Sequence, residues 1–359
     1  MRNITKSEEK ALNLLLDKCT DFPESDHKSP MLYNYIKLLA IIQDKEIKQL
    51  DNTLENTEKV YVLTRQFGII ASNIVKSASK ENSAIDYFAS YYSLEQIIEK
   101  ELSSEVYLYA KQWGLSVKAL YFYKKGDYQK GIDFSLECIA LNEYLIRAGV
   151  HTLVFRSAEQ NRNISRILFK KRDWATASAL SNDLLNYLFN SNPGSLYGAV
   201  FSEKHYWDKN LYIREGYAYE CFRAAVSQMV QIENKNSDLN LNLFNLMFKN
   251  IEIEPSTPDR LIIHNYLELK NCFNAENYEL FIEDLVHYMN EPISQLYDIL
   301  KISLFLDLIK FIINSNYAFK ESLVKLIKHH LEFKLNSNET LRKDISSKNF
   351  IANEFNVNN

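Results

Sequence analysis

The chain has 359 residues, enough for two or three ordinary domains or for one extended array of repeats. Its residues are 46% hydrophobic and 25% charged, with only eight glycines and six prolines, which indicates a globular, mainly helical protein rather than one rich in tight turns. The formal net charge of -4 argues against a general nucleic-acid binder, which would normally show a basic balance.

The first apolar run, Ala11 to Leu16, is interrupted by Asn13 and is too short and polar for a signal peptide. A later apolar stretch, Ser303 to Ile313, contains Asp307 and Lys310 and falls short of the roughly 20 residues that span a bilayer. We therefore expect a soluble, cytoplasmic protein with no membrane insertion. Its richness in Asn, Lys, Ile and Tyr fits an AT-rich genome and favours a bacterial source.

The stretch from Met31 to Asn192 contains no proline, the residue that most strongly interrupts helices, so it can form nearly continuous helical hairpins. Start signals support further helices: Thr5 with Glu8 predicts a capping box, and Thr257 before Pro258 predicts a second helix start. We predict an extra short helix within residues 238–250. Helical hairpins are expected at residues 5–50, 54–100, 103–147, 151–191, 198–235, 258–290 and 293–334.

A short pattern occurs twice, as KKGDYQKGIDF at residues 124–134 and, 46 positions later, as KKRDWATASAL at residues 170–180. Each copy has an aspartate followed by an aromatic residue, and then a small residue, Gly131 or Ala177, three places on. We interpret the pattern as the turn of a helical hairpin: the acid caps the second helix, the aromatic packs back on the first, and the small residue lets the helices cross closely.

Weaker copies of this step extend a loose period along the chain. Their spacings of 45, 46, 43, 61 and 39 residues favour stacked helical hairpins. The anchors are Asn82, Asp127, Asp173, Gly216, Asn277 and Asn316.

The segments LYFYKKGDYQKGIDFSLECI and ILFKKRDWATASALSNDLL resemble tetratricopeptide repeats. The resemblance implies an all-α fold, an α-α superhelix built as a solenoid of antiparallel helix hairpins. The family's period is about 34 residues, so the longer period here requires longer helices. Asn161 stands in the slot that Leu115 fills one hairpin earlier, which is a further departure. Arrays with such long helices are similar to bacterial peptide-pheromone receptors, although no helix-turn-helix precedes the repeats.

This resemblance divides the chain into three parts. Residues 1–100 are expected to be an N-terminal helical region, either divergent repeats or a cap. Residues 101–335 are expected to form the repeat array, and residues 336–359 a polar, mostly disordered tail.

The first helices of such hairpins line a concave surface that suits an extended peptide or a partner helix. Counting from the turns places Ser116, Leu120 and Glu159 on this surface. Arg162 and Arg166 lie one helical turn apart and could hold a carboxylate, although such a pair also occurs as a solvated stripe. The candidate ligand-binding residues are Trp113, Tyr123, Arg162, Arg166, Phe169, Tyr266 and Lys270.

Residues 205–220 contain an arginine, Arg214, with five aromatic residues around it, a composition found both in helix cores and at interfaces. The five are Tyr206, Trp207, Tyr212, Tyr217 and Tyr219. We favour the core.

Enzyme signatures fail on their spacing. Gly126 and Gly131 have the spacing of a phosphate loop, but the lysine and hydroxyl residues that must follow are missing. His329 and His330 are adjacent and point about 100 degrees apart on a helix, so they cannot share a metal. The four cysteines lie far apart, as expected for reduced, buried thiols. We predict no catalytic residue, no cofactor and no metal.

The sequence therefore predicts a non-enzymatic, peptide- or protein-binding scaffold, and it leaves the ligand and the oligomeric state open. Two alternatives remain. One is an accessory or regulatory subunit that holds an enzyme or transporter through its outer face. The other is a helical enzyme with a pocket near Arg162, Arg166 and Tyr206.

Overall fold

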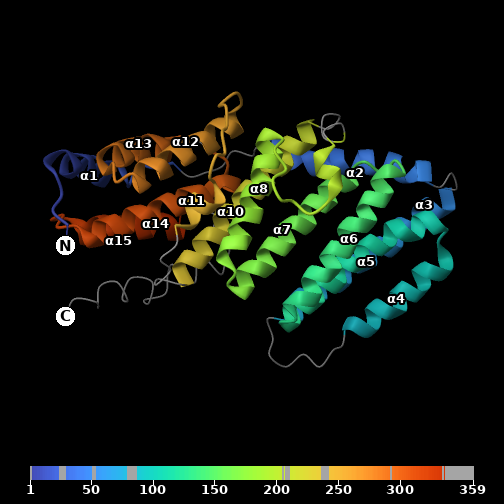
Figure 1. The fold of residues 1–359 in the computed structure, drawn as a ribbon. Helices are drawn as coiled ribbons and strands as arrows, with labels where there is room; N and C mark the ends of the chain where they lie inside the picture. Colours follow the sequence, from blue (N-terminus) through green and yellow to red (C-terminus); the bar gives the residue numbers. More distant parts are fainter. Residues whose placement is uncertain are drawn as a thin grey trace. The chain divides into compact units, whose positions relative to one another are not determined.

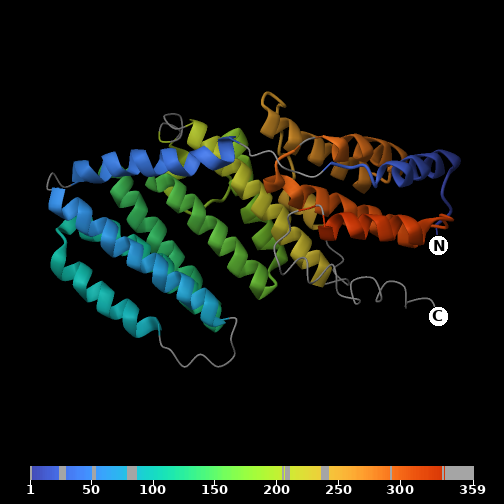
Figure 2. The same cartoon turned by 180° about the vertical axis from the view of Figure 1, so that it is seen from behind.

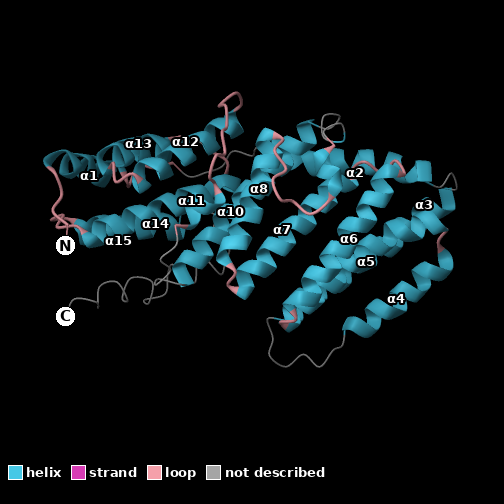
Figure 3. Ribbon diagram, viewed as in Figure 1, coloured by secondary structure: helices cyan, strands magenta, loops and turns pink. Residues whose placement is uncertain are grey.

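The computed structural model of the protein describes residues 2–23, 30–50, 54–78, 87–203, 206, 211–235, 242–291, 293–333 and 335. The described residues form helices and loops with no strand among them (Figure 3). None of these helices is both long and apolar enough to cross a membrane. The helices are α1 (Lys6–Lys18), α2 (Pro30–Leu50), α3 (Leu54–Ala78), α4 (Tyr87–Glu101), α5 (Ser104–Lys125), α6 (Tyr128–Arg147), α7 (Leu153–Lys171), α8 (Trp174–Asn190), η1 (Ala199–Ser202), α10 (Leu211–Lys235), α11 (Leu243–Met247), α12 (Pro258–Asn274), α13 (Tyr278–Asn290), η2 (Gln295–Tyr297), α14 (Asp298–Asn314) and α15 (Lys320–Phe333).

The chain divides into two compact units. Unit 1 comprises Met1–Tyr33, Phe222–Phe244 and Glu252–Asn359. Unit 2 comprises Asn34–Cys221 and Asn245–Ile251. The expected polar tail and the Asn82 anchor lie outside the described residues.

In unit 2, helices that follow one another in the chain pack against one another. Helix α5 packs on α6, α6 on α7 and α7 on α8, and α3 packs on both α4 and α5. Figure 1 shows α5 to α8 as a row of neighbouring helices. Helix α2 runs across the ends of this row (Figure 2), where the Glu46 carboxylate accepts hydrogen bonds from Thr152 N at 3.0 Å and Thr152 Oγ1 at 2.5 Å. Glu46 thereby caps the start of α7.

The repeated acid-aromatic step closes helical hairpins, as the sequence predicts. In each turn a residue with positive φ is followed by an N-cap residue, whose backbone N–H donates to the carbonyl five residues earlier at 3.0 or 3.1 Å. The N-cap dihedrals are nearly identical, with φ between -82° and -84° and ψ between 68° and 73°. These turns are Gly126–Asp127, Arg172–Asp173 and Glu276–Asn277.

The aromatic residue after each cap packs against an aromatic residue in the last turn of the preceding helix. The ring centroids of Tyr123 and Tyr128 are 6.2 Å apart. Those of Phe169 and Trp174 are 6.3 Å apart, and those of Phe273 and Tyr278 are 5.4 Å apart. One local arrangement thus recurs at three places in the chain.

The small residues sit at close helix contacts, also as predicted. A Cβ added to Gly131 would lie 3.3 Å from the carbonyl oxygen of Ala119 in α5. Ala177 is fully buried, and its own carbonyl accepts a hydrogen bond from Ser165 of α7 at 2.9 Å.

Two weaker copies of the step are not helix starts. Gly216 lies inside the unbroken helix α10, where a Cβ would meet the Tyr35 side chain at 2.5 Å, so glycine there allows the close approach of α2. Asn316 lies in the loop before α15, and its Oδ1 accepts a hydrogen bond from Ile4 N at 3.0 Å. Both positions are set by a distant segment of chain rather than by a local turn.

In unit 1, α12 packs on α13 and α14, α14 packs on α15, and α1 packs on α13. Helix α1 starts at the predicted capping box, because Thr5 Oγ1 accepts from Glu8 N while Glu8 Oε2 accepts from Thr5 N at 2.8 Å. The predicted start at Thr257 and Pro258 is likewise the start of α12.

Two predicted pairings differ in the structure. The helices of residues 5–50 do not form a simple pair: α1 belongs to unit 1, and α2 from Asn34 onward belongs to unit 2. In residues 198–235 the described elements are the short η1 and the 25-residue α10, rather than two comparable helices. Within residues 238–250 the structure describes the short helix α11.

Candidate functional site

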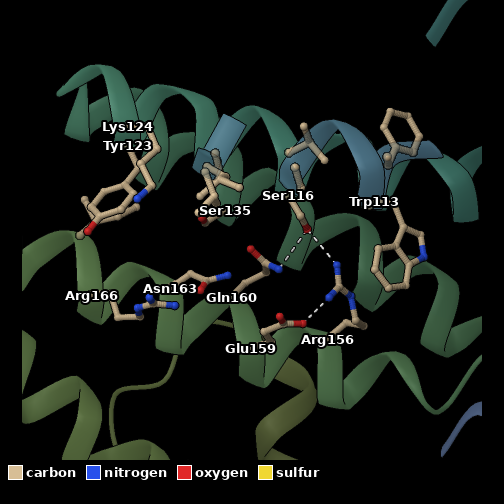
Figure 4. A pocket seen from close by; sticks show the side chains of 18 residues that line it. Trp113, Ser116, Tyr123, Lys124, Ser135, Arg156, Glu159, Gln160, Asn163 and Arg166 are labelled. Carbon is tan, nitrogen blue, oxygen red and sulfur yellow. Dashed lines mark hydrogen bonds and ion pairs between the residues drawn. The ribbon is translucent and has the colours of Figure 1, made fainter. Parts of the chain in front are cut away.

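A pocket of about 430 Å³ lies in unit 2, between α3, α5 and α7 (Figure 4). With the exception of Ser135 of α6, every lining residue comes from one of these three helices. Because α5 and α7 are the first helices of their hairpins and α3 precedes the α4 partner, the pocket lies on the surface formed by first helices.

The two sides of the pocket differ in polarity. Helix α3 contributes Phe67, Gly68, Ala71 and Val75, which form an apolar side. Helix α7 contributes positions spaced three and four residues apart, which share one face of the helix and are mostly polar. These α7 residues are Arg156, Glu159, Gln160, Asn163, Arg166 and Ile167.

A polar cluster near Trp113 fixes one end of the pocket. Ser116 Oγ accepts hydrogen bonds from Arg156 Nη2 and Gln160 Nε2, each at 3.1 Å. The Arg156 guanidinium also pairs with Glu159 and lies 3.9 Å from the centre of the Trp113 ring. Figure 4 shows the hydrogen bonds from Arg156 and Gln160 meeting at Ser116. Arg156 is thus already neutralised by a partner within the protein.

Gln160 is a member of this cluster that keeps an unsatisfied polar atom, as Trp113 does at Nε1. Its residue is fully buried, its Nε2 is used by Ser116, and its Oε1 has no hydrogen-bond partner among the described residues. A buried acceptor without a donor costs free energy, so this atom is a point where a ligand N–H could be bound with gain.

The other end of the pocket is cationic. Tyr123, Lys124 and Arg166 lie there together (Figure 4). Burial lowers the pKa of Arg166, and the neighbouring Arg162 lowers it further. Burial also lowers the pKa of Lys124, with repulsion from Arg166 and Lys170 acting in the same direction. Among the described residues neither Lys124 nor Arg166 has an ion pair, so an anion bound between them would relieve this repulsion.

The structure brings three of the seven candidate residues to this pocket: Trp113, Tyr123 and Arg166. Arg162 does not line it, although it lies one turn from Arg166. Its side chain is directed towards Tyr217 and Cys221 of α10, and it lowers the pKa of the Cys221 thiol against the larger, opposite effect of burial. Phe169 is 3% exposed and packs on Trp174.

Tyr266 and Lys270 lie in unit 1, buried between α12 and α14. The Tyr266 hydroxyl is 3.1 Å from Ser303 Oγ, and Lys270 Nζ donates to Asp307 Oδ2 at 2.5 Å. The count from the turn gives them the same helical position as the α5 residues, but here α14 covers that face.

Ser116, Leu120 and Glu159, which the count from the turns places on the concave surface, also line this pocket, together with Arg156 and Gln160, which the count does not include. The sequence pattern does allow Arg156 and Gln160 to be predicted, because they lie on the same face of α7 as Glu159 at helical spacing. No sequence motif marks the α3 residues as part of the pocket.

The aromatic segment lies mainly in the core, as favoured. Tyr206, Tyr217 and Tyr219 are buried, and Arg214 Nε donates to the Leu188 carbonyl at 2.7 Å. Trp207 lies outside the described residues.

Among the residues that the structure describes, no group of three or more His, Cys, Asp or Glu side chains is placed to hold a metal ion. Comparison with models of protein families, with curated proteins and with solved structures finds no match to this chain.

Proposed function

We propose that this protein is a non-enzymatic binding module that takes an extended peptide segment into the pocket between α3, α5 and α7. The observation that carries the proposal is the division of the pocket into an apolar side on α3 and a row of polar side chains on α7. An extended peptide presents its side chains and its backbone amides to different sides, and such a groove can bind both.

The dimensions support a peptide. Trp113 and Lys124 line opposite ends of the pocket on α5, eleven positions apart. They are therefore separated by roughly 16 Å along the helix axis, about the length of five residues of extended chain. The buried Gln160 Oε1 belongs to the cluster at the Trp113 end and offers an acceptor for a peptide N–H.

The α-α superhelix of a tetratricopeptide-like array belongs to the same proposal. Its support is the recurrence of one turn geometry in three hairpins and the packing of successive helices in unit 2. In such an array the first helices form the binding surface, which is where the pocket lies. A bacterial, cytoplasmic setting is proposed with it from the composition.

The test is selection from a library of short random peptides displayed on phage, with the purified full chain immobilised. We expect enrichment of related sequences on the natural protein. The matched control is Ala71→Phe, which places a ring into the pocket from the α3 side and should remove the enrichment while leaving the helical circular dichroism unchanged. No enrichment on the natural protein, or the same enrichment on Ala71→Phe, would rule the proposed pocket out.

A further inference from the structure

Gly68 occupies an unusual place in the middle of α3. A Cβ added there would meet no atom of the described residues within 4 Å. The helix glycines Gly114, Gly131 and Gly216 are different, since an added Cβ would meet neighbours at 2.8, 3.2 and 2.5 Å. Glycine weakens a helix interior relative to alanine, so an open helical position without a packing reason for glycine calls for another explanation.

Gly68 lies where two pockets meet. It lines the pocket between α3, α5 and α7, and it also lines a second, more open pocket of about 740 Å³ along α3. Gly68 and Trp113 are the residues common to both linings. A chain passing from one pocket to the other would cross α3 at Gly68, where the missing side chain lets a peptide backbone approach closely.

The joined pockets are basic although the whole chain has a net charge of -4. Lys124 and Arg166 line one end, and Arg65 lines the second pocket. Among the described residues that line either pocket, Glu159 is the one acidic side chain, and it is paired with Arg156. Unpaired cations at both ends of a groove favour a ligand that carries negative charge at both ends.

We infer that the ligand is an acidic peptide in extended conformation that crosses α3 over Gly68, with one carboxylate near Lys124 and Arg166 and another near Arg65. The inference rests on the proposed peptide-binding function and adds the charge of the ligand and its path. In the middle of the path, Gln160 Oε1 accepts a backbone N–H, and the apolar side chains of the peptide contact Phe67, Ala71 and Val75.

The test uses fluorescein-labelled pools of short random peptides with the same apolar residues, one pool rich in Asp and Glu and the other rich in Lys and Arg. A labelled oligothymidine strand serves as a third probe. Fluorescence anisotropy with the full chain should show binding of the acidic pool, weakened by about tenfold or more when salt is raised to about 0.5 M. Equal or tighter binding of the basic pool or of oligothymidine would overturn the inference.

Variants test the path. Gly68→Ala should raise Tm by about 2 °C, because alanine favours the helix, and yet weaken binding of the acidic pool by about tenfold or more. The Lys124→Ala/Arg166→Ala double variant should also bind the acidic pool about tenfold or more weakly. Gln66→Ala, at an exposed α3 position outside both pockets, should bind as the natural protein does.

The outcomes separate the two proposals. If both peptide pools bind equally and both are lost in Ala71→Phe, the acidic preference is wrong while the peptide-binding function stands. If Gly68→Ala binds the acidic pool as well as the natural protein does, the path over α3 is wrong. If the natural protein binds neither peptide pool, the peptide-binding function itself is wrong.

Discussion

The side chain of Asn161 pairs with both backbone groups of Tyr197: its Oδ1 accepts from Tyr197 N at 2.9 Å, and its Nδ2 donates to Tyr197 O at 3.0 Å. Asn161 is fully buried in α7, in the slot that Leu115 fills in α5. The polar residue that departs from the repeat pattern thus holds the loop after α8 against α7. An apolar residue could pack at this position but could not satisfy the loop backbone.

Replacing Asn161 by leucine, the residue of the preceding hairpin, should therefore destabilise the protein. The change leaves one N–H and one C=O of Tyr197 without partners, for an expected loss of about 2–3 kcal/mol in the free energy of unfolding. Urea unfolding followed by circular dichroism measures this loss. Asn190→Leu at an exposed position of α8 is the control and should change stability by less than about 0.5 kcal/mol. An Asn161→Leu variant as stable as the natural protein would show that the loop does not need the hydrogen bonds from Asn161 to Tyr197.

The hairpin turns allow a pair of substitutions with opposite signs. Gly126 has φ of 82° and Arg172 has φ of 64° at the same position of the turn. A Cβ added at Gly126 would meet no atom within 4 Å, so Gly126→Ala acts only through the strained backbone conformation. It should lower the free energy of unfolding by about 1 kcal/mol. Arg172→Gly relieves a similar strain, although glycine also gives the unfolded chain more conformational freedom. The net effect should be an increase of about 0.5 kcal/mol in the free energy of unfolding. Thermal unfolding of the two variants should shift Tm in opposite directions, and equal shifts would contradict the shared geometry.

The buried ion pair between Lys270 and Asp307 predicts strong non-additivity. Their side chains are 3% and 5% exposed. Lys270→Met leaves a buried carboxylate with only the more distant Lys310, at 3.8 Å, and should cost about 3–5 kcal/mol. The double variant Lys270→Met/Asp307→Leu removes both charges and should recover most of that loss. The check is a double-mutant cycle from chemical unfolding, in which additive losses would refute the expectation.

Lys301 predicts a pH dependence of stability. It is 1% exposed, and its Nζ donates to the Met289 carbonyl at 3.3 Å. Burial lowers its pKa from 10.5 to about 8, although Asp298 favours the charged form. Between these values the unfolded chain keeps a proton that the folded protein has lost, so raising the pH above about 8 stabilises the fold. At lower pH both states are protonated, and the full cost of burying the charge remains.

The measurement is the free energy of unfolding from about pH 7 to about pH 9.5, compared with that of Lys301→Met. The natural protein should gain on the order of 2 kcal/mol relative to the variant over this range. The comparison is needed because burial raises the pKa of the Cys138 and Cys221 thiols to about 11, which acts in the opposite direction at the same pH. Parallel curves for the two proteins would show that Lys301 does not titrate in this window.

Much of the local structure could be predicted from sequence. The capping box at Thr5 and the helix start at Thr257 involve residues three positions apart. The turns at Asp127 and Asp173 depend on a cap, a left-handed residue and an aromatic pair within about six residues. Such interactions join residues that are close in sequence and form wherever the backbone turns in this way, so the amino-acid sequence alone identifies them.

The positions of Gly216 and Asn316 show where local reading fails. Both residues resemble the turn pattern in sequence, but α2 packs on Gly216 and the N-terminal segment binds Asn316. The same holds for the candidate site: Arg166 lines the pocket, whereas Arg162 faces α10.

The sequence by itself determined an all-helical chain, the ends of most helices and the geometry of its repeated turns, because these depend on hydrogen bonds and packing within a few residues. Only the tertiary structure decided that Lys270 is buried against Asp307, that Asn161 holds a loop and that Gly68 lies open between two pockets. Each of these depends on which distant helix covers a given face, and helical spacing leaves that choice open.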